Sequence, residues 1–232
     1  MPPTLIAQLS DPHLRLDDDA SQPALAKAVE RVLALRPAPV AVLVTGDIAN
    51  SGHPAEHERA KELLAPLSMP VFTAAGNHDL LTMRHQYAAE AGGIRLVVCD
   101  TSIRGSDDGA LDIEWLAAHI APDRPTIVAM HHPPILMGLP WLDAIGLPEA
   151  DRSALAALLR DNPQVLRVVA GHVHRATSNV LGGCAVVTCA STNIQAELDF
   201  TTDEMALANE PPSILVHAFL DGGDVITHVQ PV

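Results

Sequence analysis

Five short polar motifs in this chain combine the residue types that bind divalent metal ions in proteins. Apart from His78 and Asp79, their side chains include two aspartates, one asparagine and four histidines. Carboxylate and amide oxygens bind hard cations, whereas imidazole nitrogens bind transition metals and zinc. A mixed set of this size predicts two ions of Mn, Fe, Zn or Co rather than Mg or Ca. The motifs are Asp11-x-His13, Gly46-Asp47, Gly76-Asn77-His78-Asp79, His131 and Gly171-His172-x-His174.

Each motif follows an apolar run that is typical of a buried β-strand. Parallel strands of an open α/β sheet end at the same edge, and ligands gather there. We therefore expect the motifs to converge in space although they lie far apart in the chain. The glycines at positions 46, 76 and 171 are expected to let the chain turn sharply before a ligand. The apolar runs are Leu5–Ser10, Val40–Val44, Pro70–Ala75, Thr126–Met130 and Val165–Ala170.

Helical patterns separate these runs up to about residue 175 and then stop, which is typical of an α/β domain followed by antiparallel strands. Two turns, Gly182-Gly183 and Asp221-Gly222-Gly223, are each flanked by apolar strands as in a β-hairpin. We predict one domain over residues 1–232. Residues 176–232 are expected to form hairpins that complete a second sheet, and residues 135–150 a lid. The predicted helices are Ser21–Leu35, Pro54–Leu67, Met83–Ala91, Leu111–Ile120 and Asp151–Leu159.

The composition limits the possible partners. Hydrophobic residues make up 48% of the chain, too large a share for a disordered protein. The net charge of -14 repels phosphate backbones and argues against a nucleic-acid partner. No apolar run approaches the roughly 18 residues of a membrane-spanning helix, so no membrane partner is expected. The three cysteines favour reduced thiols, and we expect a cytoplasmic protein.

In their order and spacing the motifs resemble the signature of the calcineurin-like metallophosphoesterases, D-x-H, G-D, G-N-H-[DE], H and G-H-x-H. The match runs from Asp11 to His174 without a missing ligand. The resemblance implies an α/β fold, a four-layer α/β/β/α sandwich with two mixed β-sheets. It also implies two ligand sets that share Asp47 as a bridge. These sets are Asp11, His13, Asp47 and His174 for one metal, and Asp47, Asn77, His131 and His172 for the other.

His131 is preferred to its neighbour His132 because the family ligand is followed by x-Pro. In such a site the two metals lower the pKa of a bridging water, and the hydroxide attacks phosphorus in line with the leaving alkoxide. His78 is the candidate to protonate or stabilise that leaving group. Asp79 is expected either to orient the His78 imidazole or to serve only as a helix-entry residue.

Several features indicate which branch of the family the chain resembles. No Arg follows Gly46-Asp47, where Ser/Thr phosphatases of the family grip a phosphate dianion, and Asn50 stands where purple acid phosphatases have a Tyr. Around residues 9–14, 130–134 and 142–147 the chain looks like the bacterial class III cyclic nucleotide phosphodiesterases and their relatives, the glycerophosphodiesterases. This implies hydrolysis of 3′,5′-cAMP-type cyclic nucleotides or other small phosphodiesters. The alternatives are a glycerophosphodiesterase, a broad-specificity phosphomonoesterase, or a metal-binding scaffold without activity.

Other residues are expected to contact the substrate or to lie at the surface. Asn77, His78 and His174 are candidate substrate-binding residues as well. Trp141 is expected either to form an apolar wall for a base or alcohol group, or to pack against the core or another subunit. The edges of the late hairpins can pair between subunits, so we expect a homo-oligomer, a dimer or higher. The helix-start pair His53 and His57 is expected to be surface rather than a metal site.

Overall fold

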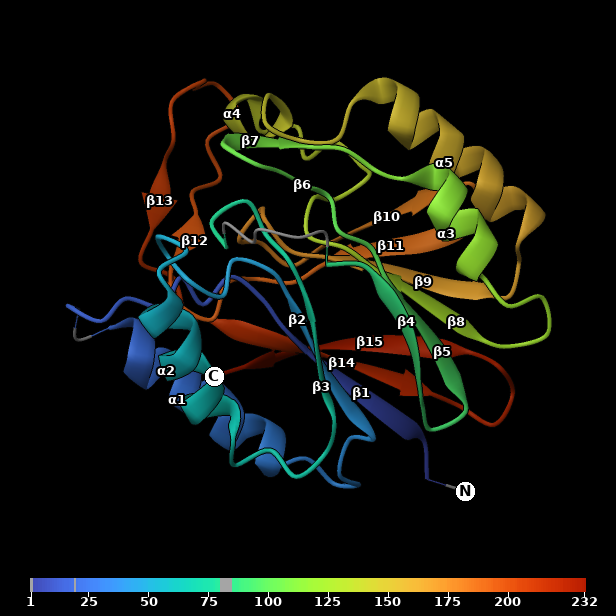
Figure 1. Ribbon diagram of the computed structural model, residues 1–232, viewed down its shortest axis with the longest axis horizontal. Helices are drawn as coiled ribbons and strands as arrows, with labels where there is room; N and C mark the ends of the chain where they lie inside the picture. The colour runs from blue at the N-terminus through green and yellow to red at the C-terminus, as the bar shows by residue number, and fades with distance from the viewer. Residues whose placement is uncertain (1, 19, 80–84) are drawn as a thin grey trace.

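The computed structural model describes residues 2–18, 20–79 and 85–232. Within these residues, two β-sheets pack face to face and helices cover both outer surfaces (Figure 1). The first sheet has the strand order β15-β14-β1-β2-β3, and the second has the order β10-β11-β9-β8-β5-β4. The predicted four-layer α/β/β/α sandwich is confirmed.

The first sheet combines three parallel strands with an antiparallel pair. Strands β1, β2 and β3 are parallel, and β14 pairs antiparallel with both β1 and β15. This arrangement places the carboxyl ends of the three parallel strands at one edge of the sheet. The bounds are β1 (Thr4–Leu9), β2 (Ala41–Thr45), β3 (Val71–Ala74), β14 (Ser213–Phe219) and β15 (Val225–Pro231).

The second sheet has four parallel strands between two antiparallel edges. Strands β5, β8, β9 and β11 run parallel, while β4 and β10 pair antiparallel with β5 and β11. The bounds are β4 (Tyr87–Ala91), β5 (Ile94–Val98), β8 (Thr126–Ala129), β9 (Val165–Ala170), β10 (Thr177–Leu181) and β11 (Cys184–Thr188).

Helices cover the outer face of each sheet. Helices α1 (Ser21–Leu33) and α2 (Pro54–Leu64) pack on the first sheet, and α3 (Ile113–His119) and α5 (Glu149–Asp161) on the second. His53 caps α2, because its side chain accepts a hydrogen bond from the amide of Ala55. This gives His53 a structural role at the helix start, in line with its expected surface position. No helix of the described chain is long and apolar enough to cross a bilayer.

The core follows the alternation of side chains along the strands. In β1, Ile6 packs between the two sheets, whereas the next residue, Ala7, packs under the helices of the first sheet. Burial on both faces explains why the strands are uninterrupted apolar runs. The rigid layers hold the strand ends, and with them the polar motifs, in fixed positions.

One predicted helix is wrong. Residues 83 and 84 of the expected helix Met83–Ala91 lie outside the described residues, and Tyr87–Ala91 forms strand β4. Gly92 and Gly93 form its hairpin turn with β5, both at positive φ, instead of ending a helix. The Tyr87 hydroxyl accepts from the amide of Thr73 and donates to its carbonyl, at 2.9 and 3.0 Å. Pairing with β5 and the hydrogen bonds to Thr73 of β3 outweigh the helical propensity of the alanines.

The two late hairpins divide between the sheets, whereas we expected both in the second. Hairpin β10–β11 joins the second sheet, but β14–β15 joins the first, because β14 pairs along β1 from Thr4 to Gln8. Two smaller pairs lie beyond the strand ends, namely β6 (Ser102–Ile103) with β7 (Ser106–Gly109) and β12 (Gln195–Ala196) with β13 (Leu207–Ala208). Residues 193–208, which contain β12 and β13, are called the ribbon below. The short helix α4 (Pro140–Asp143) lies in the predicted lid segment.

Candidate metal centre

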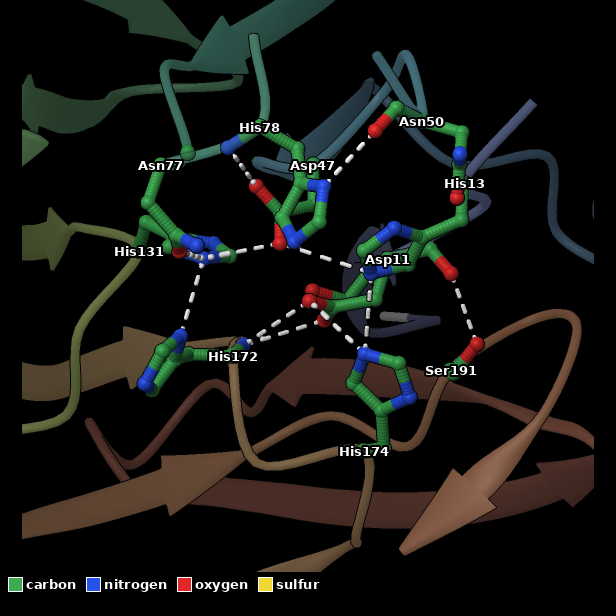
Figure 2. Close-up of polar contacts among 12 residues, drawn as sticks. Asp11, His13, Asp47, Asn50, Asn77, His78, His131, His172, His174 and Ser191 are labelled. Atoms are coloured by element: carbon green, nitrogen blue, oxygen red, sulfur yellow. Dashed lines mark hydrogen bonds and ion pairs between the residues drawn. The ribbon is translucent and has the colours of Figure 1, made fainter. Parts of the chain in front are cut away.

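The polar motifs meet where the strands of both sheets end (Figure 2). Asp11, Asp47 and Asn77 follow β1, β2 and β3 of the first sheet. His131 and His172 follow β8 and β9 of the second sheet. The seven predicted ligand side chains therefore lie in one cluster that spans the junction of the two sheets.

One half of the cluster is formed by Asp11, His13 and His174. Nε2 of His174 lies 3.5 Å from Oδ1 of Asp11 and 3.0 Å from Nε2 of His13. Nε2 of His13 lies 3.4 Å from Oδ2 of Asp47. These four side chains offer two carboxylates and two imidazoles, a set that can hold one divalent ion.

The other half of the cluster is formed by Asn77, His131 and His172. Nε2 of His131 lies 3.0 Å from Oδ1 of Asn77 and 3.3 Å from Nδ1 of His172. Oδ2 of Asp47 lies 3.4 Å from Nε2 of His131 and the same distance from Nε2 of His13. The Asp47 carboxylate thus lies between the two halves, where a bridging ligand must be.

Backbone carbonyls determine which imidazole nitrogen faces the cluster. Nδ1 of His131 donates to the carbonyl of Thr45 at 2.8 Å, and Nδ1 of His174 donates to the carbonyl of Ile194 at 2.7 Å. Both Nε2 atoms therefore point inward. A carbonyl partner of this kind is the usual way in which a protein orients a metal-binding histidine.

The atoms around His131 suit a metal ion better than a proton. Nε2 of His172 donates to the carbonyl of Ile145 at 3.0 Å, so its Nδ1 keeps a lone pair towards His131. Oxygens of Asn77 and Asp47 face the same Nε2 of His131. A single proton on this nitrogen cannot satisfy three acceptors, whereas all four atoms are of the types that would hold a divalent ion. The donor set therefore fits a metal.

Burial and charge have opposite effects on the ionisation of this cluster. Burial alone would raise the pKa of Asp47, but the imidazoles of His131 and His13 hold it well below its usual value. Burial lowers the pKa of His131, but the Asp47 carboxylate outweighs this effect and raises it to about 10. Burial lowers the pKa of His13 to about 3, which keeps that imidazole neutral. The cluster thus stabilises positive charge beside Asp47 and leaves a neutral nitrogen ligand at His13.

The backbone at the ligands is strained. Every non-glycine residue with positive φ in the described chain is a predicted ligand. This left-handed conformation costs about 1–3 kcal/mol per residue, so the surrounding structure must hold it in place. Strain of this kind concentrates at functional sites. The residues and their φ values are Asp11 (49°), His13 (43°), Asp47 (50°), His172 (68°) and His174 (48°).

Glycines in the motifs mainly allow close packing. A Cβ on Gly76 would lie 2.2 Å from Oδ1 of Asp47, and a Cβ on Gly171 would lie 2.1 Å from Oγ of Ser10. Neither glycine has a positive φ, whereas Gly46 has a φ of 91°. The expected sharp turn therefore applies to Gly46. At Gly76 and Gly171, glycine is required because a side chain would not fit.

The expected contact between Asp79 and the His78 imidazole is absent. Nδ1 of His78 instead donates to the carbonyl of Asn50 at 2.7 Å. The buried Asp79 carboxylate accepts from the amides of Ala49 and Gly76, at 3.0 and 2.8 Å. Asp79 therefore ties the turns after β2 and β3 together, because each of its oxygens accepts from one of the two turns.

His131 lies beside Asp47 and Asn77, whereas the nearby His132, with a ring nitrogen within 4.8 Å of those of His131 and His172, has other hydrogen-bond partners. The His132 ring nitrogens lie 2.9 Å from the hydroxyl of Thr101 and 3.1 Å from the carbonyl of Asp107. His57 lies further out, with its Nε2 3.2 Å from the carbonyl of Asp79. His132 and His57 both have protein partners outside the seven-residue cluster.

Ser191 is a functional contact that the motifs do not predict. Its hydroxyl donates to the carbonyl of Asp11 at 2.6 Å (Figure 2) and accepts from the amides of Asn193 and Ile194. Ser191 thereby holds the strained backbone of Asp11 and the start of the ribbon together. The sequence does carry one hint, because Ser191 follows the apolar run of β11 just as the ligands follow other strands.

A cavity of about 450 Å³ opens over the cluster. His13, Asp47, Asn77, His78, His172 and His174 line its floor, and Trp141, Ile194, Met205 and Leu207 line part of its wall. Trp141 thus lies where a substrate-contacting residue was expected. The volume is within the ~300–1,000 Å³ range typical of small-molecule sites.

Known proteins resemble the chain in sequence and in fold. The family model described as calcineurin-like phosphoesterase matches residues 4–176. A probable glycerophosphodiester phosphodiesterase GpdQ of Arcobacter nitrofigilis is 30% identical over 97% of this chain and 92% of its own length. The 3′,5′-cyclic adenosine monophosphate phosphodiesterase CpdA of Pseudomonas aeruginosa is 32% identical over 87% and 82%. A dimetal phosphatase structure from Danio rerio superposes with a TM-score of 0.76 at 14% identity, covering 100% and 97% of the two chains.

Proposed function

The chain belongs to the calcineurin-like phosphoesterase family, and on this premise we propose that it is a dinuclear-metal phosphodiesterase for cyclic nucleotides of the 3′,5′-cAMP type or other small phosphodiesters. The observation that carries the proposal is the pair of ligand groups that share the Asp47 carboxylate. Oδ2 of Asp47 lies 3.4 Å from an imidazole nitrogen on each side. Such sharing is the requirement for two ions held roughly 3.5–4 Å apart.

We assign the seven converging side chains as metal ligands, in the two sets that the motifs predict. Two bound divalent ions supply a water of lowered pKa and neutralise charge on the phosphate. The mixed oxygen and nitrogen donors suit Mn, Fe, Zn or Co. In Asn77, Nδ2 donates to Oδ1 of Asp107 at 3.1 Å, and this fixes Oδ1 as the atom that faces the metal side.

We assign His78 to the leaving group. Its Nδ1 is held by the carbonyl of Asn50, and the side chain lines the cavity over the ligands. In the cationic form, Nε2–H is the remaining donor and can give its proton to the departing alkoxide oxygen. General acid catalysis of this kind contributes about 10²–10⁴-fold in rate.

The proposal extends to location and assembly. All three cysteines are buried, and Cys184 and Cys189 are free thiols, which fits a reducing compartment, so we place the protein in the cytoplasm. The outer strand β15 exposes Ile226 and Val229, at 45% and 57%. An exposed edge of this kind can pair with another copy, and sedimentation analysis that finds only monomers at micromolar concentration would contradict the expected homo-oligomer.

A phosphoester panel on the metal-loaded protein tests the function. We expect 3′,5′-cAMP and bis(p-nitrophenyl) phosphate to be hydrolysed faster than a phosphomonoester, and His172→Ala to abolish the activity. A glycerophosphodiester hydrolysed faster than cAMP would favour the glycerophosphodiesterase alternative, which the GpdQ relatives also represent. Faster monoester hydrolysis would indicate a phosphomonoesterase. Bound metal without any turnover would indicate a scaffold.

A further inference from the structure

Part of the cavity lies beyond the seven predicted ligand side chains. Residues outside the family motifs form the wall of this part. One side comes from α4 and the turn after it, which contribute Trp141 and Ile145. The other side comes from the ribbon, which contributes Ile194, Met205 and Leu207. These side chains are apolar, in contrast to the imidazoles and carboxylates of the floor.

The lid segment and the ribbon pack together as one unit. Leu139 and Leu142 share an apolar cluster with Ala196 of β12 and with Val173, which lies between the two ligand histidines after β9. In Figure 1, α4 and the β12–β13 pair lie at the same end of the molecule. The wall is therefore continuous and is fixed to the backbone that carries His172 and His174.

The ribbon side of this wall is exposed. Met205 is 70% and Leu207 43% accessible to solvent, although both line the cavity. Covering such side chains with an apolar group is favourable by roughly 25 cal/mol per Å². Trp141, which is half-buried, adds an aromatic ring to the wall. A flat apolar group bound above the ligand cluster would cover all three of these side chains.

Charged residues line the cavity beside the apolar wall, and Arg15 is one of them. Asp18 and Asp107 also line the cavity, but both carboxylates already have partners. Asp18 accepts from the amide and the hydroxyl of Ser21, and Asp107 accepts from Asn77.

The ribbon is also connected to a ligand. The carbonyl of Ile194, at the start of the ribbon, accepts from Nδ1 of His174 at 2.7 Å. A group held on the ribbon is thereby positioned relative to the metal side of the cavity. The distance between wall and cluster is set by the protein rather than by the substrate.

We propose that Trp141, Met205 and Leu207 form a base-binding wall that holds the purine of a cyclic nucleotide while its phosphate lies on the ligand cluster. This inference rests on the proposed phosphodiesterase function. It names cyclic nucleotides as the preferred substrates over glycerophosphodiesters, because the aliphatic alcohols of the latter cover less of the wall. The three residues act as specificity determinants.

Steady-state kinetics with two substrates test the wall. The ratio of kcat/KM for 3′,5′-cAMP to that for glycerophosphoethanolamine is measured in Trp141→Ala, Met205→Ala and the control Leu198→Ala. Leu198 is an exposed apolar residue on the same ribbon, but it lines a different cavity. We expect the ratio to fall about tenfold or more in Trp141→Ala, the size of losing one base-stacking contact, and severalfold in Met205→Ala. The ratio should stay unchanged in Leu198→Ala.

An unchanged ratio in both wall variants, or an equal fall in the control, would overturn the proposal. Calorimetric titration with adenosine, which has no phosphate, tests the wall separately from catalysis. Wild-type protein should bind adenosine and Met205→Ala should bind it more weakly, whether or not any diester is hydrolysed. Diester hydrolysis without adenosine binding refutes the wall alone, whereas adenosine binding without hydrolysis refutes the proposed function alone.

Discussion

At the residue scale, Gly76-Asn77-His78-Asp79 combines several different roles in one strand-end turn. Gly76 leaves space for Asp47, and the oxygen of Asn77 faces His131. The backbone amide of His78 donates to Oδ1 of Asp47 at 2.9 Å, so the motif also orients the shared carboxylate. In the proposed site, Asn77 is assigned to metal binding and His78 to the leaving group, although the two residues are adjacent.

This division predicts different defects for the two alanine variants. Asn77→Ala should lower the metal content of the protein, because it removes an oxygen ligand. His78→Ala should keep two metals and lose about 10²–10⁴-fold in rate, most for leaving groups of high pKa. Metal analysis combined with a series of aryl phosphodiesters checks both expectations. Equal metal loss in the two variants would show that the motif has a different division of roles.

Ser191 shows why part of the site could not be predicted. Histidine and aspartate motifs are visible in the sequence because those residue types can bind metal ions. The carbonyls of Thr45 and Ile194 orient ligands equally well, but every residue has a carbonyl, so nothing marks them. The five ligand motifs were predicted from residue type, whereas the partners that orient them depend on the folded backbone.

Removal of the Ser191 hydroxyl should lower the affinity for the metal on the side of Asp11. In Ser191→Ala, the carbonyl of Asp11 loses its donor, and two ribbon amides lose their acceptor. Loss of a partner that orients a ligand typically costs about 10–100-fold in metal affinity. We expect one metal to dissociate at a higher free-metal concentration than in wild type, while the other stays bound. Ser178→Ala, on the exposed part of β10, is the matched control.

At the scale of elements, the strand ends were predicted well and one helix was not. Apolar runs identify buried parallel strands because both of their faces need apolar side chains. β4 is an edge strand rich in alanine, and alanine favours a helix in the absence of a partner. Its true state depends on the hairpin with β5 across Gly92-Gly93 and on the contact between Tyr87 and Thr73, which are 14 residues apart.

Contacts between β1, β14 and β15 contain a buried histidine that predicts an acid effect on stability. His217 in β14 is fully buried, and its ring nitrogens lie 3.0 Å from the side chains of Gln8 and Thr227. Burial, and then the charge of Arg167, lower the pKa of His217 to about 3. The unfolded chain binds a proton near pH 6.5, so this group destabilises the fold as the pH falls from about 6.5 towards 3.

The expected effect of His217 is about 2 kcal/mol of unfolding free energy lost between pH 7 and pH 5. His217→Gln keeps a hydrogen-bonding side chain but does not titrate, so its stability should fall less over this range. Urea unfolding of both proteins at the two pH values gives the comparison. Identical losses in the two proteins would mean that His217 does not remain neutral in the folded state.

At the scale of the whole molecule, the ligand cluster joins the two sheets. His131 of the second sheet donates to Thr45 of the first, and the amide of His172 donates to the Asp11 carboxylate at 3.1 Å. The sandwich and the cluster therefore depend on each other, because separation of the sheets would pull the ligand sets apart. This dependence explains how motifs that are far apart in the chain can act as one site.

Metal titration of the metal-free protein tests the central claim most directly. Chelator-treated protein is titrated with Mn²⁺ while hydrolysis of bis(p-nitrophenyl) phosphate and bound metal are followed together. The account predicts no hydrolysis without metal and full activity only when two ions are bound per chain. Undiminished hydrolysis by metal-free protein, or full activity with a single ion bound, would contradict it.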